Sequence, residues 1–349
     1  MEKLNWGIIG LGRIADSFSN GFFNAENANL ISVASQDNNK LRKYKETFKI
    51  NPKYLFNNYN DLIECKNVDI IYLALPNNLH CDWALKVIDN DKNILLEKPA
   101  ILSVAEGKSV FDKLVDKDVY FTEAFAYRYL PQTKKLIEIL KSQELGQTFS
   151  MDSSFGINLL TKKKFFFFNK KKKIDLKDRK FNKELGGGSI YDLGCYTTSF
   201  SLLINSILNN NKKDNFIISN IIKEIGETGV DISSSATINF ANEFFSNISC
   251  SFKKNLGSQT IIRGEKGDIL LPDTWGGENI IIKYKNGKKK MIKFENKKNI
   301  YTYQIEQISS NLLDGITKPK FPVMDINETI LNIKILERWL KNSNKNEVD

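Results

Sequence analysis

The sequence predicts an α/β protein of two domains, a doubly wound parallel sheet followed by an α/β domain with a large open, mostly antiparallel sheet. Three observations support this fold class. Apolar segments alternate with helical patterns over about the first 120 residues, as in βαβ units. Later segments are longer and alternate in polarity. The chain has 349 residues, about twice the ~150 of one domain.

The first part contains the elements of a parallel sheet. Five segments are expected to be strands, and they are residues 4–9, 30–35, 68–75, 93–96 and 119–123. Of these, 4–9, 68–75 and 93–96 are expected to be buried. Helical patterns lie between them, from residue 16 and at 41–48, 82–90 and 103–116. The strands and helices therefore alternate along the chain.

After residue 126 the pattern changes to strands that alternate in polarity. The expected strands are residues 148–156, 231–240, 247–252, 258–263, 268–271, 279–285 and 289–294. Lys266-Gly267 and Asn286-Gly287 are turn signals between some of them. An amphipathic helix at 326–340 closes the second part.

The composition is that of a globular protein, with 41% hydrophobic and 26% charged residues. We expect no signal peptide and no membrane span. The four cysteines are far apart in the sequence, which predicts neither a disulfide framework nor a zinc ribbon and favours the cytoplasm. His80 is the single histidine, so a multi-histidine metal site is excluded and we predict no metal.

The formal net charge of +10 comes mainly from lysine, since only six residues are arginine. Proteins that read DNA bases favour arginine, and no arginine cluster is present. We therefore predict no nucleic-acid partner, although the charge alone also suggests a basic protein that binds membrane or nucleic-acid surfaces.

A glycine-rich turn joins the first strand to the first helix. Gly10 permits a tight turn, Gly12 lets the backbone approach a pyrophosphate, and Ala15 keeps the helix close to the strand. The helix N-terminus then points its N–H groups at the phosphates. Because this turn is the first one of a βαβαβ pattern, we expect it to bind a dinucleotide.

The end of the second strand, Ser35-Gln36-Asp37, bears on the choice of cofactor. NAD sites place a carboxylate there to hold the ribose 2′-hydroxyl. Ser35 suits a 2′-phosphate better, and Lys40 and the basic residues after it supply positive charge. We favour NADP(H), with NAD(H) as the alternative if Asp37 bends back to the ribose.

Two segments follow the ends of the central strands. Glu97-Lys98-Pro99 ends a strand at the edge where ligands of open α/β sheets bind, so Lys98 is placed to meet a substrate. A solvated lysine is the structural alternative. His80 follows Pro76-Asn77-Asn78, and we expect it to shape the loop near the cofactor rather than to act in catalysis.

The most distinctive string is residues 186–196, which begins with three glycines. Ser189 is a good helix N-cap, and Asp192 and Tyr196 are then i and i+4 on one helical face. Gly194 inside the helix indicates the close approach of something flat. The structural alternative is a buried tyrosine hydrogen-bonded to a structural aspartate.

These motifs together resemble the Gfo/Idh/MocA oxidoreductase family over nearly the whole chain, including Pro76-Asn77-x-x-His80 and Gly264-x-x-Gly267. The resemblance implies a Rossmann domain at residues 1–124 and a substrate-binding and oligomerisation domain at 125–349. Tyr196, where many members have histidine, is similar to a branch with glucose–fructose oxidoreductase, dimeric dihydrodiol dehydrogenase and aldose (xylose) dehydrogenases. That branch usually uses NADP(H), but Gln36 stands where it often has arginine.

The resemblance also implies the roles of individual residues. Lys98 and Tyr196 form the acid/base pair, and Asp192 orients them. Tyr127 and Arg128 join Asp192 and Tyr196 on the substrate side, where Arg128 grips a carboxylate or phosphate or pairs with Glu123. The expected cofactor contacts are Gly10, Gly12, Arg13, Ile14, Ser35, Gln36, Lys40, Leu75, Pro76, Asn77, His80, Glu97 and Lys98.

The predicted function is hydride transfer between NAD(P) and a sugar-like alcohol or carbonyl of aldose, polyol or dihydrodiol type. One alternative is a nucleotide-sugar dehydrogenase or reductase in surface-polysaccharide synthesis, whose diphosphate residues 162–173 could meet. Another is a non-catalytic NADP-binding regulator. The family implies a homodimer or homotetramer through the C-terminal sheet.

Residues 162–173 have lysines on both sides of four phenylalanines and have no family counterpart. Three interpretations of this segment stay open. The phenylalanines pack onto a partner subunit, dip into a membrane interface, or fold back in a loop while the lysines stay in water.

Overall fold

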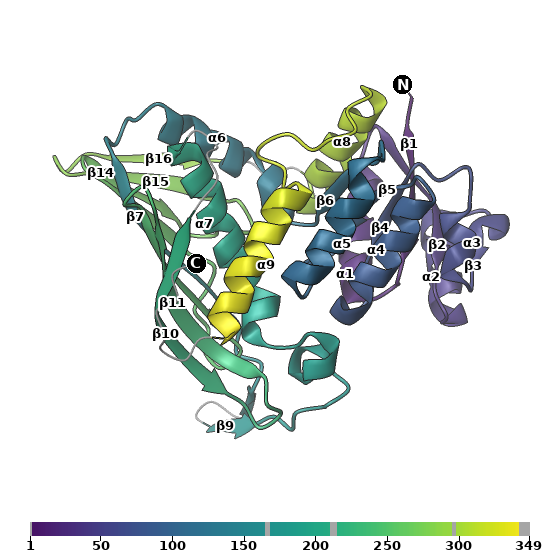
Figure 1. Ribbon diagram of the computed structural model, residues 1–349, viewed down its shortest axis with the longest axis horizontal. Coiled ribbons are helices and arrows are strands. Elements are labelled where there is room, and N and C mark those ends of the chain that lie inside the picture. Colours follow the sequence, from purple (N-terminus) through teal and green to yellow (C-terminus); the bar gives the residue numbers. More distant parts are fainter. Residues whose placement is uncertain (1, 165–167, 210–214, 295–297, 342–349) are drawn as a thin grey trace. The chain divides into compact units, whose positions relative to one another are not determined.

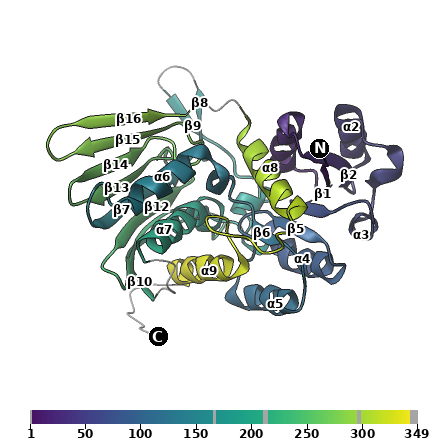
Figure 2. The ribbon, with the colours of Figure 1, turned by 90° about the horizontal axis from the view of Figure 1, so that it is seen from above.

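The computed structural model describes residues 2–164, 168–209, 215–294 and 298–341, and for residues 162–171 it describes only the backbone. The described residues form two compact units. The first consists of those within 1–130 and 296–330, and the second of those within 131–295 and 331–349. Figures 1 and 2 show the ribbon of each unit from two directions.

A six-stranded parallel sheet forms the centre of the first unit. Its strands follow the order β3-β2-β1-β4-β5-β6. They are β1 (Leu4–Ile9), β2 (Ala28–Ala34), β3 (Leu55–Phe56), β4 (Ile70–Leu73), β5 (Asn93–Leu96) and β6 (Phe121–Glu123). All four residues of β4 are buried, as expected of a central parallel strand. The order reverses at β1, so the doubly wound sheet is confirmed.

Helices cover both faces of this sheet. They are α1 (Arg13–Ser19), α2 (Asn38–Phe48), α3 (Tyr59–Ile63), α4 (His80–Asp89), α5 (Val104–Val115) and α8 (Ile300–Leu313). Side chains of α1, α2 and α8 share one core with Trp6 of β1. On the other side, α4 packs against α5, and Figure 1 shows the two helices side by side.

Helix α8 joins the first unit from a late part of the sequence. The indole N–H of Trp6 donates to the hydroxyl of Ser309 at 3.0 Å, and the hydroxyl of Thr302 donates to the carbonyl of Gly21 at 2.8 Å. Residues 298–330 thus pack with the first unit, whereas the predicted division after residue 124 assigns them to the second. The predicted division of the chain into a cofactor-binding part and a substrate-binding part stays a prediction.

The second unit is built on an eight-stranded sheet in the order β10-β11-β12-β7-β13-β14-β15-β16. Its strands are β7 (Thr148–Gly156), β10 (Phe216–Ile225), β11 (Asp231–Phe240), β12 (Phe245–Ser251), β13 (Thr260–Gly264), β14 (Gly267–Leu271), β15 (Asn279–Tyr284) and β16 (Lys289–Lys293). Only β12 and β7 pair in parallel, so the large, mostly antiparallel sheet is confirmed. Strand β10 was not among the predicted strands.

Two helices cover one face of this sheet. Helix α7 (Cys195–Leu208) packs on β7 and β12, and α6 (Pro131–Lys141) packs on α7 and β15 (Figure 2). Helix α9 (Ile326–Lys341) contributes its residues from Leu331 onward to the second unit. The short strands β8 (Thr161–Lys164) and β9 (Phe168–Lys171) pair on either side of residues 165–167, which lie outside the described residues. The three interpretations of segment 162–173 depend on side chains outside the described part of the chain, so they stay predictions.

Candidate functional site

The glycine-rich turn has the shape of a phosphate cradle. Gly10 has φ +89°, and a Cβ there would lie 2.6 Å from the carbonyl oxygen of Ala74. Gly12 is the N-cap of α1, and no side chain caps this helix. A Cβ at Gly12 would meet no atom within 4 Å. Open space therefore lies beside the N–H groups of the first turn, where Arg13 is exposed, and a pyrophosphate fits there.

The end of β2 shows what Asp37 does in the protein. Its carboxylate accepts the backbone N–H groups of Asn39 at 2.9 Å and Lys40 at 3.3 Å, so it caps α2. Ser35 is buried, and its hydroxyl accepts the N–H of Asp37 at 3.1 Å. Gln36 and Lys40 are exposed. The carboxylate that would select NAD is thus already engaged in capping a helix.

His80 links the segments that follow β4 and β5. It is fully buried at the start of α4. Its Nδ1 lies 2.8 Å from the carbonyl oxygen of Pro99, and its Nε2 lies 2.9 Å from the carbonyl oxygen of Leu75. A neutral imidazole donates to only one of these carbonyls, whereas an imidazolium donates to both. Asn77 is buried beside it in the same turn.

Lys98 follows a buried carboxylate at the end of β5. The hydroxyl of Tyr72 donates to Oε1 of Glu97 at 2.5 Å, and the N–H of Lys98 donates to Oε2 at 3.1 Å. The pKa of Tyr301 is raised to about 12, mainly by burial and also by the charge of Glu97, whereas the charge of Lys98 lowers it. The charges of Glu97 and Lys98 thus both act on the phenol of Tyr301, and the same Glu97 accepts the hydroxyl of Tyr72.

A second buried carboxyl group stands at the end of β6. Oε1 of Glu123 accepts the N–H of Ala100 at 2.9 Å, and Oε2 accepts the hydroxyl of Thr329 at 2.9 Å. Burial raises the pKa of Glu123 to about 7, although both hydrogen bonds and the charge of Arg128 lower it. Glu328 also faces this carboxyl and raises the pKa slightly.

Arg128 and Tyr127 lie in a short 3₁₀ turn, η4 (Ala126–Tyr129), and both are buried. Nη2 of Arg128 forms an ion pair with Glu328 at 2.5 Å, Nη1 donates to the carbonyl of Pro322 at 2.9 Å, and Nε donates to the hydroxyl of Tyr127 at 3.0 Å. These partners hold the guanidinium within the first unit. Contact of Tyr127 and Arg128 with a substrate stays a prediction.

In the second unit, Asp192 and Tyr196 do not share one regular helix as predicted. Asp192 lies in a single π-helical turn, η7 (Ile190–Gly194), and Tyr196 lies in the first turn of α7. Turns of this kind are frequent at functional sites. Arg179 reaches Asp192, with Nη2 3.1 Å from Oδ1. The charge of the buried aspartate is therefore matched by an arginine that the sequence did not indicate.

The start of this turn is held by a carboxyl group from β11 and not by the predicted N-cap. The Ser189 hydroxyl donates to Oδ2 of Asp231 at 2.6 Å, and the N–H of Ile190 donates to the same oxygen at 2.7 Å. Burial raises the pKa of Asp231. The flat group expected beside Gly194 is the indole of Trp339, whose Cζ3 would lie 2.9 Å from a Cβ at Gly194.

Aromatic rings surround Tyr196. Its ring centroid lies 5.2 Å from that of Phe155, edge to face, and 5.2 Å from that of Trp275. Phe155 and Trp275 also contact each other at 5.7 Å. Tyr196 and Phe155 are only half-buried. The partly accessible phenol thus lies among rings whose faces can pack against an apolar ligand surface.

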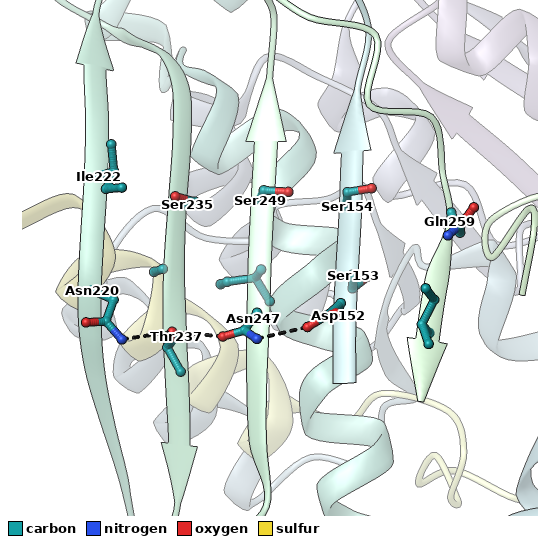
Figure 3. Close-up of a pocket in the computed structure, with 13 residues that line it drawn as sticks. Asp152, Ser153, Ser154, Asn220, Ile222, Ser235, Thr237, Asn247, Ser249 and Gln259 are labelled. Carbon is teal, nitrogen blue, oxygen red and sulfur yellow. Dashed lines mark hydrogen bonds between the residues drawn. The ribbon is translucent and has the colours of Figure 1, made fainter. Parts of the chain in front are cut away.

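The face of the large sheet that α6 and α7 leave uncovered contains a cavity of about 440 Å³. Polar side chains form a line across the neighbouring strands β10, β11, β12 and β7 on this face (Figure 3). Asn220 donates to Thr237, Thr237 to Asn247, and Asn247 to Asp152, at 3.3, 2.9 and 2.8 Å. Asp152 also forms an ion pair with Arg263 at 2.6 Å.

The same row of strand positions becomes apolar beyond β7. Asp152 pairs with Ile261 on β13, and the row then runs across the next strands. Its further members are Leu270, Ile281 and, on β16, Met291. The uncovered face is therefore polar on one half and apolar on the other. Within the described parts of the chain, no three His, Cys, Asp or Glu side chains form a metal site, and no helix is both long and apolar enough to cross a bilayer.

Family models and relatives cover most of the chain. A model described as an oxidoreductase family with an NAD-binding Rossmann fold matches residues 4–125, and the GFO/IDH/MocA C-terminal domain matches residues 133–270. Trans-1,2-dihydrobenzene-1,2-diol dehydrogenase from Xenopus tropicalis is 26% identical over 345 residues, which are 96% of this chain and 97% of the relative.

Solved structures share the fold. An aldose-aldose oxidoreductase from Caulobacter crescentus, complexed with glycerol, has a TM-score of 0.81 and 19% identity, with 97% of each chain covered. A 3-ketoreductase from Actinomadura kijaniata, complexed with NADP and TDP-benzene, has a TM-score of 0.78 and 16% identity, again with 97% of each chain covered. By its two family models, its full-length relative and its fold, the chain belongs to the Gfo/Idh/MocA family of NAD(P)-dependent oxidoreductases.

Proposed function

We propose that this oxidoreductase uses NADP(H) to interconvert an alcohol and a carbonyl on a sugar-like substrate, an aldose, polyol or cyclic diol. The observation that carries the proposal is the half-buried Tyr196 among the rings of Phe155 and Trp275, with the Asp192–Arg179 pair nearby. Aromatic faces suit the C–H surface of a ring, and a phenol exchanges a proton with an oxygen. The relative that acts on a diol and the similar aldose oxidoreductase support this substrate class.

The proposed chemistry assigns acid/base work to Lys98 and Tyr196. When bound, the nicotinamide exchanges a hydride with the substrate carbon. In reduction the phenol of Tyr196 would give its proton to the carbonyl oxygen, and in oxidation its phenolate would take the proton of the alcohol, with Asp192 as the orienting group. A tyrosine in water loses its proton near pH 10. We therefore expect carbonyl reduction to proceed near neutral pH and alcohol oxidation to accelerate at alkaline pH.

The preference for NADP(H) is supported by the end of β2. Asp37 caps α2, so turning it to a ribose would cost that cap, worth about 1 kcal/mol. Lys40 and Arg13 are exposed and available to a 2′-phosphate. Binding of NADPH and NADH is measured separately by nicotinamide fluorescence. Tighter NADPH supports the proposal, tighter NADH makes Asp37 the ribose ligand, and binding of neither contradicts a catalytic role.

A Gln36→Arg variant sharpens this test. An arginine next to Ser35 adds a planar donor group for the 2′-phosphate, so NADPH should bind about tenfold more tightly and NADH about as before. An equal gain for both cofactors would show that residue 36 does not face the 2′ position.

The substrate class is tested with a panel of aldoses, polyols, trans-dihydrodiols and nucleotide-linked sugars. Each compound is supplied with either cofactor, and nicotinamide absorbance is followed from pH 6 to 10. Turnover of free sugars or diols that rises with pH supports the proposal. Turnover restricted to nucleotide-linked sugars would contradict the proposal and favour a nucleotide-sugar dehydrogenase or reductase.

We also propose that a second copy of the chain covers the uncovered face of the large sheet, giving a dimer or tetramer, and that the protein works in the cytoplasm. The apolar half of that face and the exposed Ile222 and Met291 support the pairing. Ile281→Asp should dissociate the oligomer in sedimentation velocity, while Asn286→Asp, in the turn after β15, should leave it intact.

The proposed cytoplasmic location is supported by the four cysteines, which form no disulfide.

A further inference from the structure

Two buried residues hold the same peptide group, directly after Lys98. The carbonyl oxygen of Pro99 lies 2.8 Å from Nδ1 of His80. The N–H of Ala100, which belongs to the same peptide unit, donates to Oε1 of Glu123 at 2.9 Å. This unit is therefore held at its acceptor end and at its donor end by side chains from two different elements.

Both holding side chains are themselves fixed. His80 is 0% exposed and Glu123 is 2% exposed. The second nitrogen of His80 lies 2.9 Å from the carbonyl oxygen of Leu75, and the second oxygen of Glu123 accepts the hydroxyl of Thr329 at 2.9 Å. Glu123 accepts two hydrogen bonds, and His80 donates to the carbonyl of Pro99 when its proton is on Nδ1. Because both side chains are buried among these partners, each has little freedom to move and can fix the peptide group that it contacts.

We propose that Glu123 and His80 are positioning residues that fix the backbone from which Lys98 projects. The lysine side chain is long and flexible, so the position of its ammonium group depends on how firmly its backbone is held. Misplacing a reacting group by about 1 Å costs up to about 10²-fold in rate. The inference rests on the proposed function, in which Lys98 takes part in the reaction.

The proposal assigns the effect of Glu123 to hydrogen bonding and not to charge. The charged groups that face it are Arg128 on η4 and Glu328 on α9, and these two are paired with each other. A glutamine at position 123 keeps an acceptor oxygen for Ala100, and its amide donates to the hydroxyl of Thr329. A leucine of similar size keeps neither bond.

The first measurement needs neither cofactor nor substrate. Amide hydrogen exchange at Ala100 is followed in the wild type, Glu123→Gln and Glu123→Leu. Thr122→Val is the control, because the hydroxyl of this neighbouring buried residue donates to the carbonyl of Met324 and not to the Pro99–Ala100 unit. We expect exchange at least tenfold faster in the leucine variant and within threefold of wild type in the other two.

The second measurement separates positioning from binding. The leucine variant should lose about 10- to 100-fold in kcat, with KM and the NADPH dissociation constant within about threefold. The glutamine variant should keep most of kcat with an unchanged pH profile. If Glu123→Leu does not fold, His80→Phe tests the same peptide from its carbonyl side and should show the same loss of kcat.

Three outcomes would overturn the proposal. Unchanged exchange at Ala100 in the leucine variant means that Glu123 does not hold the peptide. Faster exchange with unchanged kcat means that the hold is only structural. Equal loss of kcat in Glu123→Gln assigns the effect to charge. A fully active Lys98→Ala variant would instead reject the proposed function, and the exchange result would still stand.

Discussion

Glu123 in the first unit and Asp231 in the second do similar work in different surroundings. Each is a buried carboxyl group that accepts one backbone N–H and one hydroxyl, from Ala100 and Thr329 in one case and from Ile190 and Ser189 in the other. Each holds backbone two residues from a candidate catalytic side chain, Ala100 after Lys98 and Ile190 before Asp192. Burial raises the pKa of both.

The surroundings differ in what else holds the segment. Near Lys98 the neighbours are ionised or polar, with the Arg128–Glu328 pair and His80 within the same unit. Near Tyr196 the neighbours are rings and close backbone contacts, with Trp339 against Gly194. Beyond the carboxyl group itself, the first unit therefore fixes its loop through a further hydrogen bond from His80, and the second fixes its helix through packing.

The largest expected effect is on catalysis in the second unit. Tyr196→Phe keeps the ring packing and removes the proton donor, so kcat should fall by about 10²- to 10⁴-fold while the melting temperature and NADPH binding stay near wild type. Tyr191→Phe, in the π-helical turn before it, is the matched control and should retain activity. Comparable losses in both variants would argue that the phenol of Tyr196 has no special role.

The pH dependence of stability tests the charge around Lys98. The pKa of Glu123 is about 7 in the folded protein against an ordinary value of 4.5, so its stabilising contribution is present below the ordinary value and is lost as the pH rises through 7. Between about pH 5 and 8 the free energy of unfolding of the wild type should fall by about 2.5 kcal/mol relative to Glu123→Gln. Asp231→Asn should show the same sign.

Urea unfolding at several pH values measures this difference. Parallel stability curves for the wild type and Glu123→Gln would show that the carboxyl group titrates at its ordinary pKa in the folded protein.

Breaking the ion pair of the first unit should have an effect of similar size. Glu328→Gln removes the charge that balances the buried Arg128, so the free energy of unfolding should fall by about 2–3 kcal/mol. Lys135→Gln, which breaks the exposed pair with Glu138 on α6, should cost under about 1 kcal/mol. Losses of similar size would mean that burial of Arg128 does not set the strength of its pair.

The smallest expected effect compares two glycines. Gly194→Ala pushes a methyl group against Trp339 and should cost about 1–3 kcal/mol of stability in the second unit. Gly12→Ala adds its methyl group to open space, so stability should change little while NADPH affinity falls about tenfold or more. Thermal unfolding and cofactor titration separate the two results, and an unchanged NADPH affinity in Gly12→Ala would exclude this turn as the cradle.

Much of the fold could be predicted because its signals are local. Continuous apolar runs marked the buried parallel strands, and alternation marked most of the large sheet. Strand β10 escaped because a bulge between Ser219 and Ile222 interrupts its alternation. Strand β3 has only two residues, and nothing in the sequence of α8 shows that it packs near Trp6, more than 290 residues earlier.

The site was predictable only in part, for the same reason. Lys98, Asp192 and Tyr196 stand in recognisable strings. Their partners come from elsewhere in the chain: Asp231 lies 42 residues from Ser189, and Thr329 lies 206 residues from Glu123. Helical periodicity could not show the π-helical turn, because the turn depends on how Asp231 and Trp339 pack around residues 189–194.

The two outer strands of the large sheet have a consequence for how the protein avoids aggregation. An unprotected edge strand invites pairing with another chain, and lysines and bulges prevent such pairing. Strand β16 carries exposed Lys289, Lys290 and Lys293, and β10 carries the bulge at 219–222, where Asn220 has φ +52°. Growth of the sheet into fibrils is therefore blocked at both ends, and the abundant lysine serves solubility where it lines the edge.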